Sequence, residues 1–108
     1  MIPDPDFETY SAMYERARDL ERRKKVAEAL DVYSDILRRF RPTGLSYYER
    51  PAILLEKQGR LEDALRVCDA ALSNDRFYEP TLHAAQREFG HRRERLLRKL
   101  ARAKRAKP

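Results

Sequence analysis

Histidine and cysteine are the side chains in this sequence best suited to bind a metal or attack a substrate, and their spacing supports neither role. His83 and His91 are eight residues apart, whereas two imidazoles that share one metal ion on a helix lie three or four residues apart. Cys68 falls in line with Leu65 and Leu72 on the apolar side of its segment, which predicts a buried, unreactive thiol. We therefore expect no metal site and no cysteine nucleophile.

Other catalytic patterns are also missing from the sequence. There is no glycine-rich phosphate loop, no Gly-x-Ser-x-Gly elbow and no His-Glu-x-x-His motif. The carboxylates alternate with Arg and Lys, as is typical of solvated helix faces. The sequence thus predicts no catalytic residues, no enzyme activity and no cofactor.

Composition predicts a single all-α domain that spans residues 1–108. Hydrophobic residues make up 42% of the chain, with 3 Gly and 6 Pro, and the abundant Ala, Leu, Glu, Arg and Lys favour helices. The one cysteine cannot form an internal disulfide, no apolar run is long enough to cross a bilayer, and the acidic N-terminus does not resemble a signal peptide. We expect a soluble cytoplasmic protein that does not contact a membrane.

An internal repeat of 35 residues determines the expected architecture. Within a window of 21 positions, seven residues are identical to the residue 35 positions later, several times more than composition alone would give. The identical pairs are Ala17/Ala52, Leu20/Leu55, Glu21/Glu56, Ala29/Ala64, Leu30/Leu65, Val32/Val67 and Leu37/Leu72. Each copy is expected to form helix, tight turn, helix.

Five helices are predicted from this repeat and from the segment that follows it. Their expected ranges are 7–22, 26–40, 46–58, 61–73 and 80–104. The first repeat then covers 7–41, the second 45–76, a capping helix 80–104 and a basic tail 101–108. A capping box from Ser46 to Glu49 predicts a start at Ser46, and Pro51 predicts a kink or a later start. The last helix should place Leu82, Ala85, Phe89, Leu96 and Leu100 on one side.

The small and acidic residues of the two copies are arranged as in a known family of helical repeats. These residues are Ala17, Leu20, Glu28, Ala29 and Leu30 in the first copy and Ala52, Leu55, Asp63, Ala64 and Leu65 in the second. Over roughly residues 8–75 the sequence resembles the tetratricopeptide repeat family, whose units of about 34 residues are antiparallel helix pairs. Gly59 and Tyr33 match the family pattern, while Lys24, Pro51 and Cys68 depart from it. The resemblance implies a tetratricopeptide-like α-solenoid.

The same resemblance implies a concave groove, lined by the first helix of each unit, that binds a peptide or a segment of a partner protein. By position, its lining residues would be Tyr14, Arg18, Arg22, Arg50, Ile53, Lys57, His83, Arg87 and His91. We expect this groove to be mostly basic, with Tyr14 and Ile53 exposed for peptide contacts. Nearby glutamates would neutralise part of the charge, so an ordinary salt-bridged face is the alternative. The only asparagine, Asn74, lies outside the groove, which argues against a carboxylate clamp.

The positive charge of the chain is concentrated at its C-terminus. Residues 87–108 hold ten Lys or Arg and two acids, a net charge of +8, while the remainder holds 14 and 16, a net charge of −2. The predicted basic patch consists of Arg92, Arg95, Arg98, Lys99, Arg102, Lys104, Arg105 and Lys107. The expected function is an adapter for another protein or peptide, with an acidic partner as one option. The alternatives are a small nucleic-acid-associated protein and a self-associating structural protein, since two repeats and a cap bury little surface.

Overall fold

The computed structural model describes residues 4–106, and this range contains helices but no strand. The helices are α1 (Phe7–Arg22), α2 (Val26–Arg39), α3 (Ser46–Lys57), α4 (Leu61–Leu72) and α5 (Thr81–Ala106). The predicted all-α class and the five helices are confirmed, with every boundary within two residues of its expected place. None of these helices is both long and apolar enough to cross a membrane.

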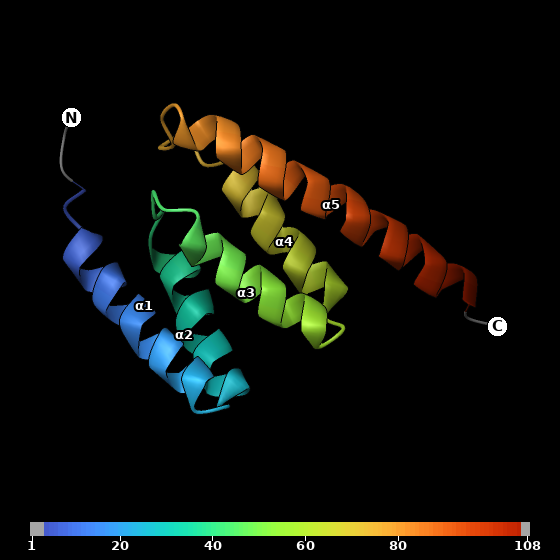
Figure 1. Cartoon of the computed structure of the whole chain (residues 1–108), viewed down its shortest axis with the longest axis horizontal. Helices are drawn as coiled ribbons and strands as arrows, with labels where there is room; N and C mark the ends of the chain where they lie inside the picture. Colours follow the sequence, from blue (N-terminus) through green and yellow to red (C-terminus); the bar gives the residue numbers. More distant parts are fainter. Residues whose placement is uncertain (1–3, 107–108) are drawn as a thin grey trace.

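The helices form a serial stack of antiparallel pairs. Helices α1 and α2 make one hairpin, α3 and α4 make a second, and α5 runs back along α4 (Figure 1). Each helix packs mainly against the helix before it and the helix after it. The result is an elongated, flat molecule with extents of 52 × 33 × 19 Å.

Both hairpins turn through the same backbone motif, although only one of them has a glycine there. Lys24 and Gly59, 35 residues apart, have left-handed φ values of 65° and 74°. In the first turn the amide of Lys25 donates to the carbonyl of Leu20 at 2.9 Å, and in the second Arg60 donates to Leu55 at 2.9 Å. This is the Schellman arrangement that closes a helix C-terminus. The first repeat therefore keeps the turn that its sequence suggested was degenerate.

Small residues at equivalent positions let the helices of each hairpin approach closely. Ala17 and Ala29 in the first hairpin, and Ala52 and Ala64 in the second, are each 0% exposed. A side chain larger than alanine at such a contact would force the helices apart. The repeat register deduced from the sequence is thus the register of the core.

The start of α3 differs from the expectation in one detail. The helix begins at Ser46 and continues through the buried Pro51 to Lys57, so the predicted later start is wrong. Leu45 is the residue that precedes the helix, with helical dihedral angles and no capping side chain. The capping box from Ser46 to Glu49 is therefore wrong, because Ser46 already lies inside the first turn.

Helix α5 closes the core with its apolar side. Ala85, Phe89 and Leu96 are buried, and Leu82 and Leu100 are half-buried beside them. The Phe89 ring meets the ring of Tyr48 edge-on, with centroids 6.2 Å apart. Because Tyr48 belongs to α3, the last helix packs on the second hairpin as a whole.

Candidate functional site

Glu21, in the last turn of α1, binds two of the cations expected to line the groove. Arg18 donates from Nη1 to Oε2 at 3.3 Å, and Arg50 from α3 donates from Nε to Oε1 at 3.2 Å and also from Nη2 to Oε2. The Tyr33 hydroxyl donates to Oε1 at 2.7 Å. Burial disfavours the carboxylate, but the hydrogen bonds from Arg50 and Tyr33 outweigh it and hold the pKa of Glu21 below its usual range. Part of the charge expected to face a ligand is therefore used inside the protein.

Glu56, near the end of α3, likewise binds cations of the next odd-numbered helix, α5. Its carboxylate accepts hydrogen bonds from Arg92 at 3.2 Å, from Arg95 at 2.8 Å and from Lys99 at 2.5 Å. The side chain of Glu56 is only 13% exposed. The hydrogen bond from Arg95 is the main reason that its pKa falls to about 2, with Lys99 adding to the effect. Glu56 is therefore ionised at every physiological pH.

The two carboxylates occupy the same position in the repeat. Glu21 and Glu56 are 35 residues apart, and each joins its own helix to the next odd-numbered helix, α1 to α3 and α3 to α5. Glu21 has two cationic partners and Glu56 has three. Both clusters therefore keep a positive excess, so this side of the helices remains basic although much of its charge is paired.

The apolar members of the predicted groove are less exposed than expected. The Tyr14 ring lies 4.9 Å from the Tyr47 ring and 5.8 Å from the Tyr33 ring, centroid to centroid. Tyr14 and Ile53 are both half-buried, so the prediction of two exposed peptide contacts is wrong. The reason for Tyr14 is that Tyr47, from α3, occupies the space beside it.

The remaining groove residues fall into two groups. Arg22, Lys57 and His91 are exposed, and within residues 4–106 none of them has an acidic partner. His83 and Arg87 lie together beside an open hollow of about 530 Å³ between the loop before α3 and the first turns of α5. The hollow is lined by Thr43, Gly44, Leu45, Glu79, Pro80, Thr81, His83, Ala84 and Arg87. This hollow gives the predicted groove room for a ligand beside α5.

A pair of glutamates also links α3 to α5. Glu49 and Glu88 are both half-buried. A hydrogen bond to Glu49, together with burial, raises the pKa of Glu88 to about 7, and the positive charge of Arg92 opposes this rise. Glu88 thus keeps its proton at pH values at which an ordinary glutamate is ionised.

Glu88→Gln should remove a pH dependence of stability. A glutamate that ionises near pH 4.5 when unfolded and near 7 when folded destabilises the fold as the pH rises between these values. The amide of glutamine can still donate to Glu49 but does not titrate. We expect the variant to be more stable than the parent by about 1–2 kcal/mol at pH 8, allowing for solvent screening, and unchanged at pH 4.

Urea unfolding at the two pH values measures this effect. Glu62→Gln, an exposed position on α4, is the control and should not change the difference between pH 8 and pH 4. The same stability change for Glu88→Gln at both pH values would contradict the raised pKa of Glu88.

The predicted basic patch divides into paired and free side chains. Arg92, Arg95 and Lys99 bind Glu56, and Arg93 donates to Asp69 at 2.7 Å. The exposed members without an acidic partner in the described part of the chain are Arg98, Arg102, Lys104 and Arg105. Lys107 lies outside the described residues. Since Arg93 was not among the predicted members, three of the seven described members of the patch are thus structural.

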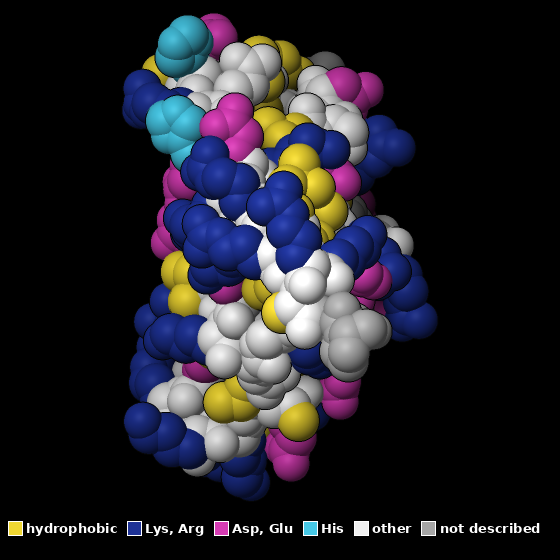
Figure 2. All heavy atoms as spheres, turned by 90° about the vertical axis from the view of Figure 1, so that its right-hand side faces the viewer, with side chains coloured by type: hydrophobic (Ala, Val, Ile, Leu, Met, Phe, Trp, Pro, Cys, Tyr) yellow, Lys and Arg dark blue, Asp and Glu magenta, His cyan; other side chains and the backbone are white. Residues whose placement is uncertain are grey.

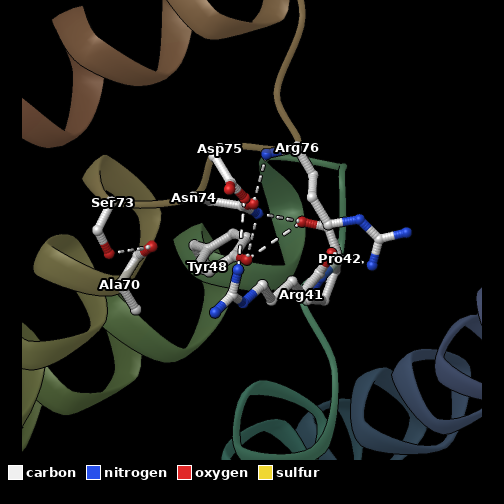
Figure 3. Close-up of polar contacts among 8 residues, drawn as sticks. All are labelled: Arg41, Pro42, Tyr48, Ala70, Ser73, Asn74, Asp75 and Arg76. Carbon is white, nitrogen blue, oxygen red and sulfur yellow. Dashed lines mark hydrogen bonds and ion pairs between the residues drawn. The ribbon is translucent and has the colours of Figure 1, made fainter.

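Asn74 connects two loops, a role that the sequence did not reveal. Its Nδ2 donates to the carbonyl of Pro42 and to the hydroxyl of Tyr48, both at 2.9 Å, and its Oδ1 accepts from the amide of Arg76 at 2.9 Å. Figure 3 shows these contacts, with Arg41 reaching across to Asp75. No local pattern could find this contact, because Pro42 and Asn74 are 32 residues apart.

Cys68 is buried, as its position on the apolar side of its segment suggested. Cys68 is 0% exposed, and burial raises the pKa of its thiol to about 11. Both histidines are exposed on α5. Within residues 4–106, no three His, Cys, Asp or Glu side chains come together as a metal ion would need.

Comparison with protein-family models, with curated proteins and with solved structures gave no match.

Proposed function

We propose that this chain is a tetratricopeptide-like interaction module that binds a segment of a partner protein along α1, α3 and α5. The observation that supports the proposal is the open hollow of about 530 Å³ beside His83 and Arg87, at one end of the expected groove. Arg22 and Lys57 are exposed on α1 and α3 without acidic partners in the described range. A peptide seated in the hollow could reach cations on all three helices.

The chemistry of this side favours a partner segment with acidic residues. The Glu21 and Glu56 clusters each hold more cations than acids, and the free cations Arg22, Lys57 and Arg87 add to the excess. Thr43, Leu45 and Ala84 give the hollow a mixed polar and apolar wall, which suits an extended peptide with one or two apolar side chains.

Ala84→Lys should lower recovery of the main protein partner by about tenfold or more, because the added side chain fills the hollow and leaves the positive charge in place. The matched control is Ala12→Lys, the same substitution at an exposed position of α1. Recovery is measured by affinity capture from a lysate of the source cell after nuclease treatment, with quantitative mass spectrometry. Circular dichroism and urea midpoints check that both variants fold.

Equal recovery by the parent and by Ala84→Lys would place the binding site elsewhere. If the protein recovered in the largest amount were a second copy of this chain, the self-associating alternative would replace the adapter.

A further inference from the structure

Four of the α5 cations that have no acidic partner within residues 4–106 lie along one side of the helix. Arg92, Arg93, Arg95 and Lys99 bind Glu56 or Asp69. The others include a set that we call the outer ridge: Arg87, Arg98, Arg102 and Arg105, which are exposed and have no acidic partner within residues 4–106. Sequence counting alone could not separate these two groups.

Helical geometry places the ridge residues in a row. Arg87 and Arg98 are separated by about three turns, and Arg98 is followed by Arg102 after about one turn and by Arg105 after about two, at 3.6 residues a turn. Leu96, which is 0% exposed, lies about half a turn before Arg98 and so marks the opposite side. The ridge therefore points away from the core and is about 27 Å long at 1.5 Å per residue.

The exposed side of α5 carries charges of almost one sign. A face that only has to be solvated usually mixes acids with bases. From Arg87 to Ala106, however, one acid is exposed in the structure, Glu94, which lies in the same row about one turn before Arg98. Lys and Arg side chains crowd this face of the molecule (Figure 2). The ridge is thus a concentrated positive surface at the end of a chain whose residues 1–86 carry a net charge of −2.

The surroundings of the ridge do not suit another protein helix. In the first two repeats Ala17 and Ala52 allow close helix contact, whereas the corresponding part of α5 has the exposed Gln86 and Arg87. Leu97, at 39%, is the only exposed large apolar side chain on the described length of α5. Since a stable protein interface needs an apolar centre, the ridge fits a ligand that it contacts mainly through charge.

We propose that the outer ridge of α5 binds the phosphodiester backbone of a nucleic acid without reading its sequence. Guanidinium groups match phosphate oxygens with two parallel hydrogen bonds, and all four ridge residues are arginines. Duplex DNA carries one charge per about 1.7 Å, so many phosphates lie within reach of the ridge. Phe89, the one Phe, Tyr or Trp residue of α5, is buried, so the rings that this helix offers to a base are those of the two exposed histidines.

A charge-matched pair of variants tests the ridge. The ridge variant carries Arg98→Gln, Arg102→Gln and Arg105→Gln. The control variant carries Arg16→Gln, Lys24→Asn and Lys25→Gln, which remove three exposed cations from α1 and the turn after it. Within the described residues these cations also lack acidic partners, so both variants lose the same net charge.

Binding to a random-sequence duplex of about 20 base pairs is measured by fluorescence anisotropy between about 50 and 200 mM salt. With four phosphate contacts, the log–log slope of affinity against salt should be about −3.6 for the parent and for the control. It should rise to about −0.9 for the ridge variant, which keeps only Arg87. Single-stranded RNA should give a parent slope of about −2.8, and a poly-glutamate peptide of similar length should bind at least about tenfold more weakly than the duplex.

Four results would overturn the proposal: no binding at the lowest salt, equal losses in the ridge and control variants, poly-glutamate binding as tightly as the duplex, or a strong sequence preference at physiological salt. The groove is tested separately, because Ala84→Lys removes no ridge arginine and should bind the duplex like the parent. A loss of duplex binding confined to the ridge variant would therefore support the ridge even if the hollow bound no peptide.

Discussion

Phe89→Ala should lower the free energy of unfolding by about 3–5 kcal/mol. The side chain is 0% exposed and packs on Tyr48, so its removal leaves a cavity between α5 and α3 that the rigid aromatic neighbours cannot fill. Since the loss is a large part of the total stability of a small domain, the urea midpoint should fall steeply. If α5 were instead an appendage, only its own residues would lose helicity.

Leu97→Ala is the matched control for this change, because Leu97 is on the exposed side of the same helix. We expect it to cost less than about 0.5 kcal/mol. Similar urea midpoints for the two variants would show that α5 does not close the core.

Glu56→Gln should cost about 2–4 kcal/mol, because it leaves three cations without their carboxylate. Arg92 contributes most to this cost, since its side chain is 15% exposed and its buried Nε already lacks a hydrogen-bond partner in the described structure, so the contact of Nη1 with Glu56 is what stabilises its charge. Arg95 and Lys99 are more than 40% exposed and can turn to solvent, so their share is small.

The pH dependence of stability gives a second measure of Glu56. Its pKa is about 2 in the folded chain and near 4.5 in the unfolded one. The carboxylate therefore stabilises the fold above about pH 4.5, and this contribution is lost as the pH falls toward 2. Unfolding of the Glu56→Gln variant should depend less on pH across this window, whereas Glu62→Gln should follow the parent. A parent and variant with parallel profiles would exclude the cluster as a stabilising element.

The sequence predicted the helices well because the same short-range signals occur twice in it. Ala17 and Ala52, or Ala29 and Ala64, have the same role at the same spacing, and the structure buries all four. The motifs that depend on a single position were less reliable: Ser46 does not cap α3, and Lys24 adopts the left-handed turn that glycine usually occupies. There the tertiary packing of two helices outweighs the preference of one residue.

The groove was predicted by position, and only part of it survives as a free surface. Arg18 and Arg50 both bind the carboxylate of Glu21. Because Arg50 is 29 residues away from Glu21 in the sequence, no local pattern could reveal that contact. The sequence did contain one signal of this contact. Among the seven residue pairs that are identical at the 35-residue shift, Glu21/Glu56 is the charged pair, and the others are apolar. A charge repeated in this way indicates a shared structural partner. Binding of a ligand at the hollow or at the ridge stays a prediction.

The loop contacts of Asn74 affect the cooperativity of unfolding. In a linear array of repeats each unit touches only its neighbours, so the ends can fray one unit at a time. Here Asn74 ties the loop after α4 to Pro42, and Arg76 continues the connection to Asp4, at 3.3 Å, ahead of the first helix. These contacts join the segment ahead of α1 to the loop between α4 and α5. The first hairpin can separate from the second only when these contacts break, so the two hairpins should melt together in one transition.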